Sequence, residues 1–350
     1  MFYQKKDGLK FIMENKEHCG AGGEFPSFVP NGKASYTEIF KEVEEYMNAE
    51  VHANVVVGAA IAGDGLLNDH GKEHIAMVIE RAMLILGEKA EELRGYEIFF
   101  LLLAIHFHDV GNVLGREEHE QKIGDIFDTL GEKFPLDYAV KRVIILISMA
   151  HGGFHEGDKD TLAYLEEQTY VDTIPIRTAL IASILRFSDE IADDKNRTSS
   201  FMRTVGAIPD NNMIFHEYSR SLEPPAKEGN TLILQYNIRN DVVDKKISKL
   251  GEEVYLYDEI LNRIQKCLCE LDYCKRYAQG YISLSYISVT IHVLDAKERR
   301  IVYEDRFKLR ITGYPSKDLF NPILCSEPTI KAKDAVKLIE LISSKENNND

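Results

Sequence analysis

Histidine and aspartate stand side by side at the end of an apolar segment, where they could bind a metal ion. The pair is His108-Asp109, which follows the apolar residues 98–105 and precedes the helix-stop residues Gly111 and Gly115. Adjacent side chains on a helix diverge by about 100°, so the two can share one ion only at a helix end or in a crowded site. When the dipeptide is taken alone, a buried histidine beside a solvated aspartate is a better explanation than a metal site, because the pair is common by chance.

The same residue types recur at comparable places, at helix ends or on one helical face, and the set is far more specific than any member. Its members are His70, His74, His108, Asp109, His119, His151, His155 and Asp189. Mixed imidazole and carboxylate ligands suit a borderline divalent ion such as Mn²⁺, Fe²⁺, Co²⁺, Ni²⁺ or Zn²⁺. We therefore predict a divalent metal site in this part of the chain.

The other histidines lack this pattern in the sequence and are interpreted as structural residues. They are His18, His52, His106, His216 and His292. Of these, His106 is expected to pack behind the site or to orient one of its ligands.

The segments that must position the candidate ligands read as helices. Ser35, with Glu38 three residues later, has the pattern of a helix start, and apolar residues recur at helical spacing from His74 to Leu86. Further helices are predicted within 117–130, 135–151, 162–167 and 175–189, without a strand between them. Residues 1–33 are rich in glycine, proline and charge, which predicts a loop with one short helix or strand near 9–13.

Beyond residue 225 the pattern changes to a mixture of strands and helices. Strands are predicted at 231–238, 286–293 and 300–309, and helices at 251–277 and 332–343. We predict a mainly α protein in three parts. These are an N-terminal extension (1–34), a helical metal-binding domain (35–222) and a small α+β domain (226–345), in which no catalytic motif is found.

Composition indicates a folded cytoplasmic protein. The 350 residues are 44% hydrophobic and 28% charged, and the formal net charge of −15 disfavours broad non-specific binding to nucleic acid. The five cysteines form no paired CxxC motif and read as reduced thiols. Residues 1–10 lack the apolar core of a signal peptide, and the apolar runs are shorter than a membrane span, so no membrane association is expected.

The order of the candidate ligands resembles the HD superfamily of metal-dependent phosphohydrolases, whose signature is H…HD…D on a helical bundle. His74 matches the first histidine, His108-Asp109 in His-Asp-Val-Gly matches the pair, and Asp189 in Leu-Arg-Phe-Ser-Asp-Glu matches the last aspartate. The resemblance covers about residues 65–200. It is strongest with the bacterial branch whose first motif reads HGxxH, as His70-Gly-Lys-Glu-His74 does.

The resemblance implies an HD-type helical bundle and roles for individual residues. His74, His108, Asp109 and Asp189 would hold one ion. A second ion, bridged by Asp109, would be held by His119, His151 and His155. In a one-ion site these histidines would instead protonate the leaving oxygen, so Asp109, His119 and His151 are the candidate catalytic residues. The candidate substrate contacts are His70, Lys72, Arg116 and Arg197; a plain surface charge is the stronger explanation for Lys72 and Arg116.

The reaction implied is hydrolysis of a nucleotide or related phosphoester by metal-activated water. Asn112 stands where HD-GYP proteins carry lysine, and a GYP motif is missing from the sequence, so cyclic-di-GMP is a disfavoured substrate. Two alternatives remain open: a single-strand nuclease of the HD type, and a regulatory or binding module with a non-catalytic metal site. The acidic charge and the lack of an aromatic-basic stripe disfavour nucleic acid as a partner. A homo-oligomer is expected only on general grounds of size.

Overall fold

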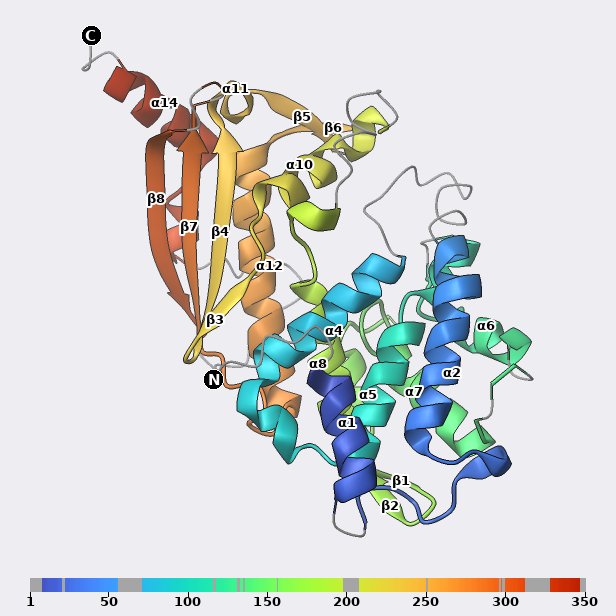
Figure 1. Cartoon of the computed structure of the whole chain (residues 1–350). Coiled ribbons are helices and arrows are strands. Elements are labelled where there is room, and N and C mark those ends of the chain that lie inside the picture. The colour runs from blue at the N-terminus through green and yellow to red at the C-terminus, as the bar shows by residue number, and fades with distance from the viewer. Residues whose placement is uncertain are drawn as a thin grey trace. The chain divides into compact units, whose positions relative to one another are not determined.

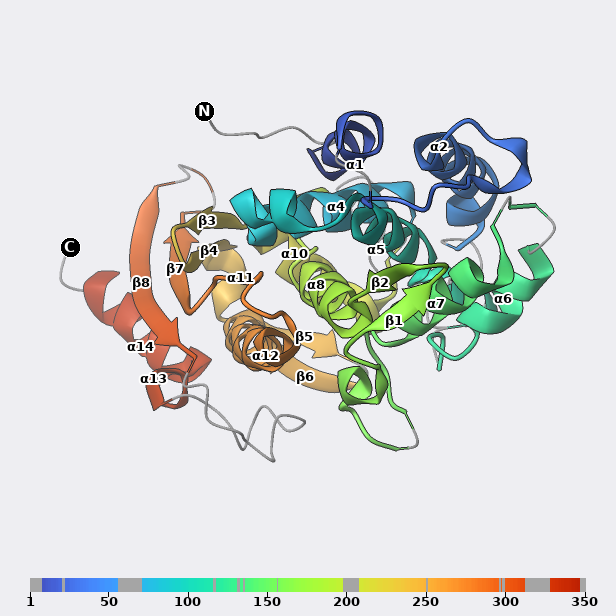
Figure 2. The same cartoon turned by 90° about the horizontal axis from the view of Figure 1, so that it is seen from below.

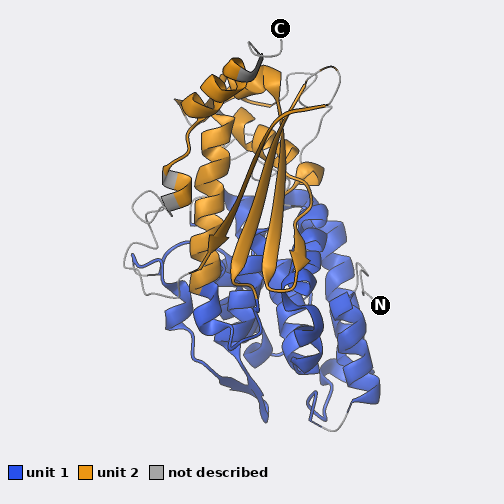
Figure 3. Ribbon diagram, turned by 90° about the vertical axis from the view of Figure 1, so that its left-hand side faces the viewer, with its two compact units in different colours: residues 1–64, 69–192, 274–283 blue, residues 65–68, 193–273, 284–350 orange. Residues whose placement is uncertain are grey.

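A computed structural model describes most of the chain. The described residues are 8–20, 23–55, 71–115, 118–130, 133–134, 136–155, 157–197, 208–249, 251–295, 297, 300–311 and 328–346. The chain forms two compact units (Figure 3). Unit 1 comprises Met1–Asp64, Asp69–Ala192 and Cys274–Ser283; unit 2 comprises Gly65–Asn68, Asp193–Tyr273 and Leu284–Asp350. The division into 1–34, 35–222 and 226–345 remains a prediction.

Unit 1 is helical, with only two short strands among its described residues. Its α-helices are α1 (Gly8–Cys19), α2 (Tyr36–Tyr46), α4 (Lys72–Leu86), α5 (Gly95–Phe107), α6 (Ile123–Leu130), α7 (Tyr138–Met149) and α8 (Thr178–Glu190). Short turns of other helix types lie between them at Pro30–Gly32, Met47–Val51, Gly87–Glu92, Val110–Leu114 and Thr161–Tyr164, and the strands are β1 (Thr169–Val171) and β2 (Ile174–Ile176). Together with unit 2 below, this confirms the predicted fold class, mainly α with a smaller C-terminal α+β part.

Helix α5 is the centre of unit 1. It contacts α1, α2, α4, α7 and α8, which lie around it (Figures 1 and 2). Every residue of α5 is buried, as its almost wholly apolar sequence requires. By length and composition the stretch Gly95–Leu114 could cross a membrane, which the apolar run lengths had not indicated. However, 89% of that window is buried inside the protein, as in a central core helix.

An ion pair joins the N-terminal ends of α5 and α8. The carboxylate of Glu97, fully buried in α5, accepts hydrogen bonds from Arg177 Nε at 2.7 Å and Nη2 at 2.5 Å. Arg177 is the residue before α8 and also donates to the Tyr281 hydroxyl at 3.0 Å. Both helices are 13 residues long. Two helices of equal length that start together and run alongside each other bring their C-terminal ends to the same level.

Unit 2 is built on a four-stranded mixed sheet of order β3-β4-β7-β8. Its strands are β3 (Ala226–Glu228), β4 (Thr231–Arg239), β7 (Tyr286–Leu294) and β8 (Ile301–Arg310). Strands β4 and β7 are parallel, so a crossover must connect them, and it contains the long helix α12 (Leu256–Tyr277). Helix α12 lies along one face of the sheet (Figure 3). The Tyr257 hydroxyl donates to Asp305 Oδ2 at 2.7 Å.

The remaining described elements of unit 2 are short. They are Lys195–Arg197, Asp210–Asn212, α10 (Met213–Ser221), α11 (Asn240–Val243), the hairpin strands β5 (Lys246–Lys249) and β6 (Glu252–Tyr255), α13 (Pro328–Lys331) and α14 (Ala335–Glu346). Among the described residues no cysteine forms a disulfide, and Cys267 and Cys274 are buried. Cys325 lies outside the described residues.

The structure corrects three of the predicted elements. Residues 8–19 form the full helix α1 where a loop with one short element was predicted. Strands β1 and β2 interrupt the part predicted to be helical throughout, and β6 occupies the predicted start of the 251–277 helix. These strands are three or four residues long, too short for an alternating pattern to stand out. The sequence also predicts that the helix containing His74 starts at Asn68 or Asp69, and these two residues lie outside the described residues.

Candidate metal centre

The His108-Asp109 pair lies where α5 ends. Residue His108 still has helical angles (φ −59°, ψ −35°), whereas Asp109 leaves the helix (φ −106°, ψ 2°) and a tight turn, Val110–Leu114, follows. The change of backbone direction lets two neighbouring side chains converge. His108 Nε2 lies 3.4 Å from Asp109 Oδ2. The pair is therefore at a helix end, as its adjacency required.

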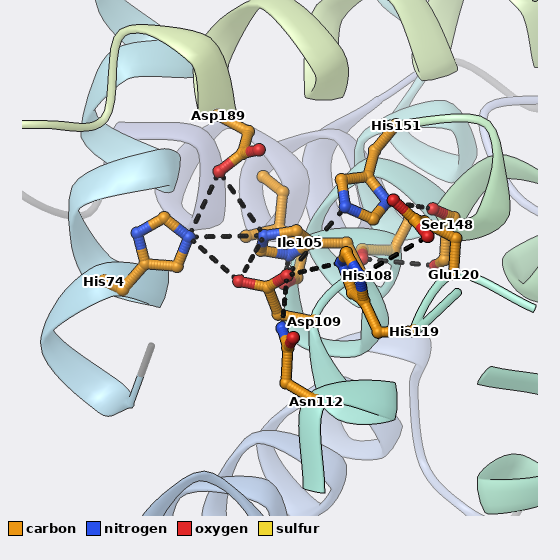
Figure 4. A network of polar contacts seen from close by, with 11 residues as sticks. His74, Ile105, His108, Asp109, Asn112, His119, Glu120, Ser148, His151 and Asp189 are labelled. Atoms are coloured by element: carbon orange, nitrogen blue, oxygen red, sulfur yellow. Dashed lines mark hydrogen bonds and ion pairs between the residues drawn. The ribbon is translucent and has the colours of Figure 1, made fainter. Parts of the chain in front are cut away.

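Two other helices bring ligands to the same point. His74 lies in the first turn of α4 and Asp189 in the last turn of α8. His74 Nε2 lies 3.1 Å from Asp189 Oδ1, 3.4 Å from Asp109 Oδ2 and 3.3 Å from His108 Nε2 (Figure 4). Four donor atoms from three helices thus face one another within a small volume.

A second group of side chains approaches the other oxygen of Asp109. His119 Nε2 lies 3.3 Å and His151 Nε2 3.8 Å from Asp109 Oδ1. Three overlapping sets could each hold an ion: His74, His108 and Asp109; His108, His151 and Asp189; and Asp109, His119 and His151. We call the six residues His74, His108, Asp109, His119, His151 and Asp189 the His-Asp cluster.

Gly111 allows the segment of His119 to approach the end of α5. A Cβ atom added at Gly111 would lie 1.9 Å from the backbone carbonyl oxygen of His119. Any larger residue would therefore push that segment away. This contact gives a physical reason for a glycine two positions after Asp109.

Backbone carbonyls orient two of the imidazole rings. His108 Nδ1 lies 2.8 Å from the carbonyl oxygen of Ile105, and His151 Nδ1 lies 2.6 Å from that of Ser148. A carbonyl can only accept, so we assign the proton of each neutral ring to Nδ1. In the neutral ring, which is the form that binds a metal, the lone pair of Nε2 points into the cluster.

Burial and charge act against each other in the cluster. Burial disfavours the charged form of His108, but the carboxylates of Asp109 and Asp189 outweigh it and raise its pKa well above the ordinary value. Burial likewise opposes the charge on Asp189, yet its hydrogen bonds with His108 and His74 bring its pKa well below the usual range. Burial and the nearby His108 and His119 lower the pKa of His151 to about 4, so this ring is neutral at pH 7.

The donor set fits a divalent ion. Two ligands bound at about 2.0–2.2 Å with tetrahedral or octahedral angles lie about 2.8–3.6 Å apart. The four contacts from His74 and His108 to the carboxylates of Asp109 and Asp189 measure 3.1–3.6 Å. The mixed set of imidazole nitrogens and carboxylate oxygens, four of whose six residues are buried, suits a borderline transition metal better than Ca²⁺.

Of the other predicted site residues, the structure describes His155, Lys72 and Arg197. His155 belongs to none of the metal-capable sets found among the described residues; it is exposed and its ring lies 4.2 Å from that of Tyr164. Lys72 is exposed at the start of α4, and Arg197 belongs to unit 2, so the structure does not place it at the cluster. His70 and Arg116 lie outside the described residues.

Sequence analysis missed two polar neighbours of the cluster. The Asn112 side-chain amide donates to Asp109 Oδ1 at 2.9 Å, and Glu120 Oε2 lies 3.4 Å from His119 Nδ1. The carboxylate of Glu120 also lies against Gly152 and Gly153. Only its position beside His119 could have pointed to Glu120. The structural histidines His52 and His106 form a buried pair, with Nε2 and Nδ1 3.1 Å apart.

Comparison with known protein families gives this cluster a context. The model of the HD-CE family matches residues 64–266, more than half of the chain. The chain belongs to the HD-CE family. No curated protein and no solved structure matched it. The HD-CE match contains all six residues of the His-Asp cluster as well as Asn112 and Glu120. The buried cluster is therefore part of the HD-CE domain, which includes residues of both units.

Proposed function

We propose that this HD-CE protein is a metal-dependent phosphohydrolase or phosphodiesterase that hydrolyses a nucleotide or a related phosphoester. One observation carries the proposal: a buried cluster in which Asp109 turns one oxygen to His74 and His108 and the other to His119 and His151. Such an arrangement suits one ion or two ions bridged by a carboxylate. The resemblance of the ligand order to the HD superfamily supports the same reaction class.

The first ion would be held by His74, His108, Asp109 and Asp189, whose donor atoms lie closest together. A second would be held by Asp109, His119 and His151. When bound, a divalent ion makes a coordinated water acidic enough to lose its proton near neutral pH and offsets charge on phosphate oxygens. We infer Mn²⁺, Fe²⁺, Co²⁺, Ni²⁺ or Zn²⁺ from the mixed donor set.

The side chains of the cluster would also bind the substrate and move protons. In a site with one ion, His119 is the better placed to protonate the leaving oxygen, because its side chain is 13% exposed whereas that of His151 is 5% exposed. Asn112 would keep Asp109 in its bridging orientation through the hydrogen bond to Oδ1. Burial keeps bulk water away from these groups, which strengthens their interactions with a phosphate.

The proposal is tested by loading the purified protein with each metal, measuring bound metal by elemental analysis, and assaying a panel of nucleotides, cyclic dinucleotides and simple phosphodiesters. We expect hydrolysis of at least one nucleotide and its loss in Asp109→Ala. Asp128→Ala, an exposed aspartate on α6 of the same unit, is the matched control and should retain full activity. Absence of turnover with every metal and substrate would refute the enzymatic proposal and leave a binding module.

The same panel distinguishes a nucleotide phosphohydrolase from the alternative, a single-strand nuclease. Short single-stranded DNA and RNA are included beside the nucleotides. Cleavage inside a strand without hydrolysis of free nucleotides would replace the proposed substrate class with nucleic acid. The metal content would assign roles: two equivalents per chain would make His119 and His151 ligands, and one equivalent would leave His119 as the candidate proton donor, because His151 is neutral at pH 7.

A further inference from the structure

Two large aromatic side chains are exposed on the loop that follows His151. The side chains of Phe154 and Tyr164 are 58% and 49% exposed. One exposed aromatic ring on a protein surface means little. Here two exposed aromatic rings lie on one loop, and that loop starts at a candidate metal ligand, so their exposure needs an explanation. We call Phe154 and Tyr164 the aromatic shelf.

The loop that carries the shelf is fixed by hydrogen bonds. His155 and Asp158 exchange two backbone hydrogen bonds of 2.8 Å, which close a tight turn. At the base of the loop, the hydroxyl of Thr161 donates to the carbonyl oxygen of Ala150 at 2.9 Å. The guanidinium of Arg186, on α8 one turn before Asp189, donates to the same hydroxyl at 2.8 Å. The loop is thereby tied to the two helices that bring His151 and Asp189 to the cluster.

The shelf begins close to the cluster. Phe154 is three residues after His151, so their Cα atoms are at most about 11 Å apart. The intervening Gly152 and Gly153 pack against the carboxylate of Glu120, which also contacts His119. Gly153 has a left-handed φ of 65° and a Cβ there would lie 2.7 Å from Glu120 Cδ, so this approach requires glycine.

Basic side chains accompany both rings. Lys159 Nζ lies 5.7 Å from the centre of the Phe154 ring, and the imidazole of His155 lies 4.2 Å from the Tyr164 ring. Any nucleobase can stack on an exposed aromatic ring, and a lysine beside the ring attracts a phosphate. An aromatic ring and a nearby candidate metal centre fit the base and the phosphoryl group of a nucleoside phosphate, and the lysine favours a negatively charged ligand.

We propose that the aromatic shelf binds the base of a nucleoside phosphate whose phosphoryl group lies at the His-Asp cluster. This assignment rests on the proposed function and narrows its substrate class to compounds with a nucleobase. It also gives His155 a role beside Tyr164 in place of the predicted role as a metal ligand.

The chain contains no tryptophan, which allows a direct test of binding. In Phe154→Trp, the new tryptophan is the only one in the protein and reports any base that stacks on it. The metal-loaded variant is titrated with AMP and, separately, with ribose 5-phosphate, which has the same phosphoryl group without a base. We expect saturable quenching by AMP and none by ribose 5-phosphate.

The matched control is Tyr138→Trp. Tyr138 is 81% exposed at the opposite end of α7, about 16 Å from the end that carries His151. A tryptophan there should give no saturable response to AMP. Equal quenching of both variants, or equal quenching by AMP and ribose 5-phosphate, would overturn the proposal. A dodecamer of deoxyadenylate run beside AMP distinguishes a free nucleotide from a strand end; saturable quenching by either supports base binding at the shelf.

Kinetics separate this inference from the proposed function. For the nucleotide that the panel identifies, Phe154→Ala should raise KM roughly fivefold to a hundredfold, the range measured for loss of one base–aromatic stack. Hydrolysis of ribose 5-phosphate or another base-free phosphoester should change less than twofold. If nucleotide hydrolysis is present but insensitive to Phe154→Ala, the shelf assignment is wrong and the phosphohydrolase proposal stands. If no substrate is hydrolysed, the tryptophan titration still decides whether the shelf binds a base.

Discussion

Asp109 uses its two carboxylate oxygens for different neighbours. Oδ2 faces His74 and His108, while Oδ1 faces His119 and accepts the hydrogen bond from Asn112. This division follows from its backbone, which leaves the helix at that residue and turns the carboxylate across the end of α5. A single residue therefore links the two halves of the cluster.

Glu120 should control the part of the cluster that contains His119. A carboxylate that accepts from Nδ1 fixes the ring and makes Nε2 a better ligand. We expect Glu120→Gln to weaken binding of the metal held by His119 about tenfold or more, while the ion held by His74 and His108 is unaffected. Calorimetric titration with the metal measures both affinities. The control is Glu118→Gln, an exposed neighbour in the chain; equal affinities in both variants would remove Glu120 from the site.

Gly111 should be intolerant of any side chain. In Gly111→Ala the new Cβ would meet the carbonyl oxygen of His119 at 1.9 Å, so the backbone must shift. We expect the free energy of unfolding in denaturant to fall by about 2 kcal/mol. Gly124→Ala on α6 is the control, since open space surrounds that position and alanine favours a helix by about 0.5–1 kcal/mol. Equal stability of the two variants would show that the contact at Gly111 is unimportant.

The sequence indicated the candidate ligands that the structure brings together, but not the residues that support them. His74, His108, Asp109 and Asp189 could be found because ligand residue types recur at the ends of apolar helices. Glu120 could not be found, because its glycine contacts lie more than 30 positions further along the chain. Contacts between distant loops leave no periodic pattern in a single sequence.

Among the helices, the Glu97–Arg177 pair sets how α5 and α8 lie against each other. Removing one partner of a buried pair leaves the other charge unpaired, which costs about 3–5 kcal/mol. We expect Glu97→Gln to lower the free energy of unfolding by an amount toward the lower end of that range, because Arg177 keeps some contact with water. Metal affinity should fall as well, since α8 carries Asp189. The stability and the metal affinity of Glu97→Gln are compared with those of Glu91→Gln, which alters an exposed carboxylate. If the two variants behave alike, the coupling is refuted.

Glu44 gives unit 1 an acid-sensitive contact between α1, α2 and α5. Burial alone would raise the pKa of Glu44, but His106 and Lys10 outweigh it and lower the value to about 2. A carboxylate with a depressed pKa stabilises the fold above its ordinary value near 4.5, and this contribution disappears as the pH falls towards 2. Glu44→Gln should therefore cost about 1 kcal/mol at pH 7 and much less at pH 3. Denaturant unfolding at both pH values tests this, and an equal cost at each would contradict it.

The long, strongly patterned elements were predictable and the short ones were not. Ser35 caps α2 as expected, its side chain accepting from the backbone of Glu38. Strands β4, β7 and β8 lie within one or two residues of their predicted bounds. The three-residue strands β1 and β2 carry too little pattern, and their pairing depends on a turn at Asp172, whose φ of 54° no local rule identified.

For the whole molecule, metal binding should be visible as thermal stability. An ion that binds only the folded chain stabilises it by about 2.7 kcal/mol at a hundredfold excess over its Kd. We expect a chelator to lower the Tm by several degrees and added Mn²⁺ or Zn²⁺ to restore it. Asp109→Ala should show no metal-dependent shift. A chelator-insensitive Tm in the metal-loaded wild-type protein would argue against a tightly held ion.

The pairing of α5 and α8 limits how the chain can change in length. Glu97 and Arg177 join the N-terminal ends of the two helices, and each helix positions residues of the His-Asp cluster at or just beyond its C-terminal end. One residue inserted into either helix would turn its terminal ligand by about 100° and displace it by about 1.5 Å along the axis. The geometry of the cluster therefore does not tolerate insertions or deletions within these two helices. Substitutions that preserve the burial of the helices leave this geometry unchanged.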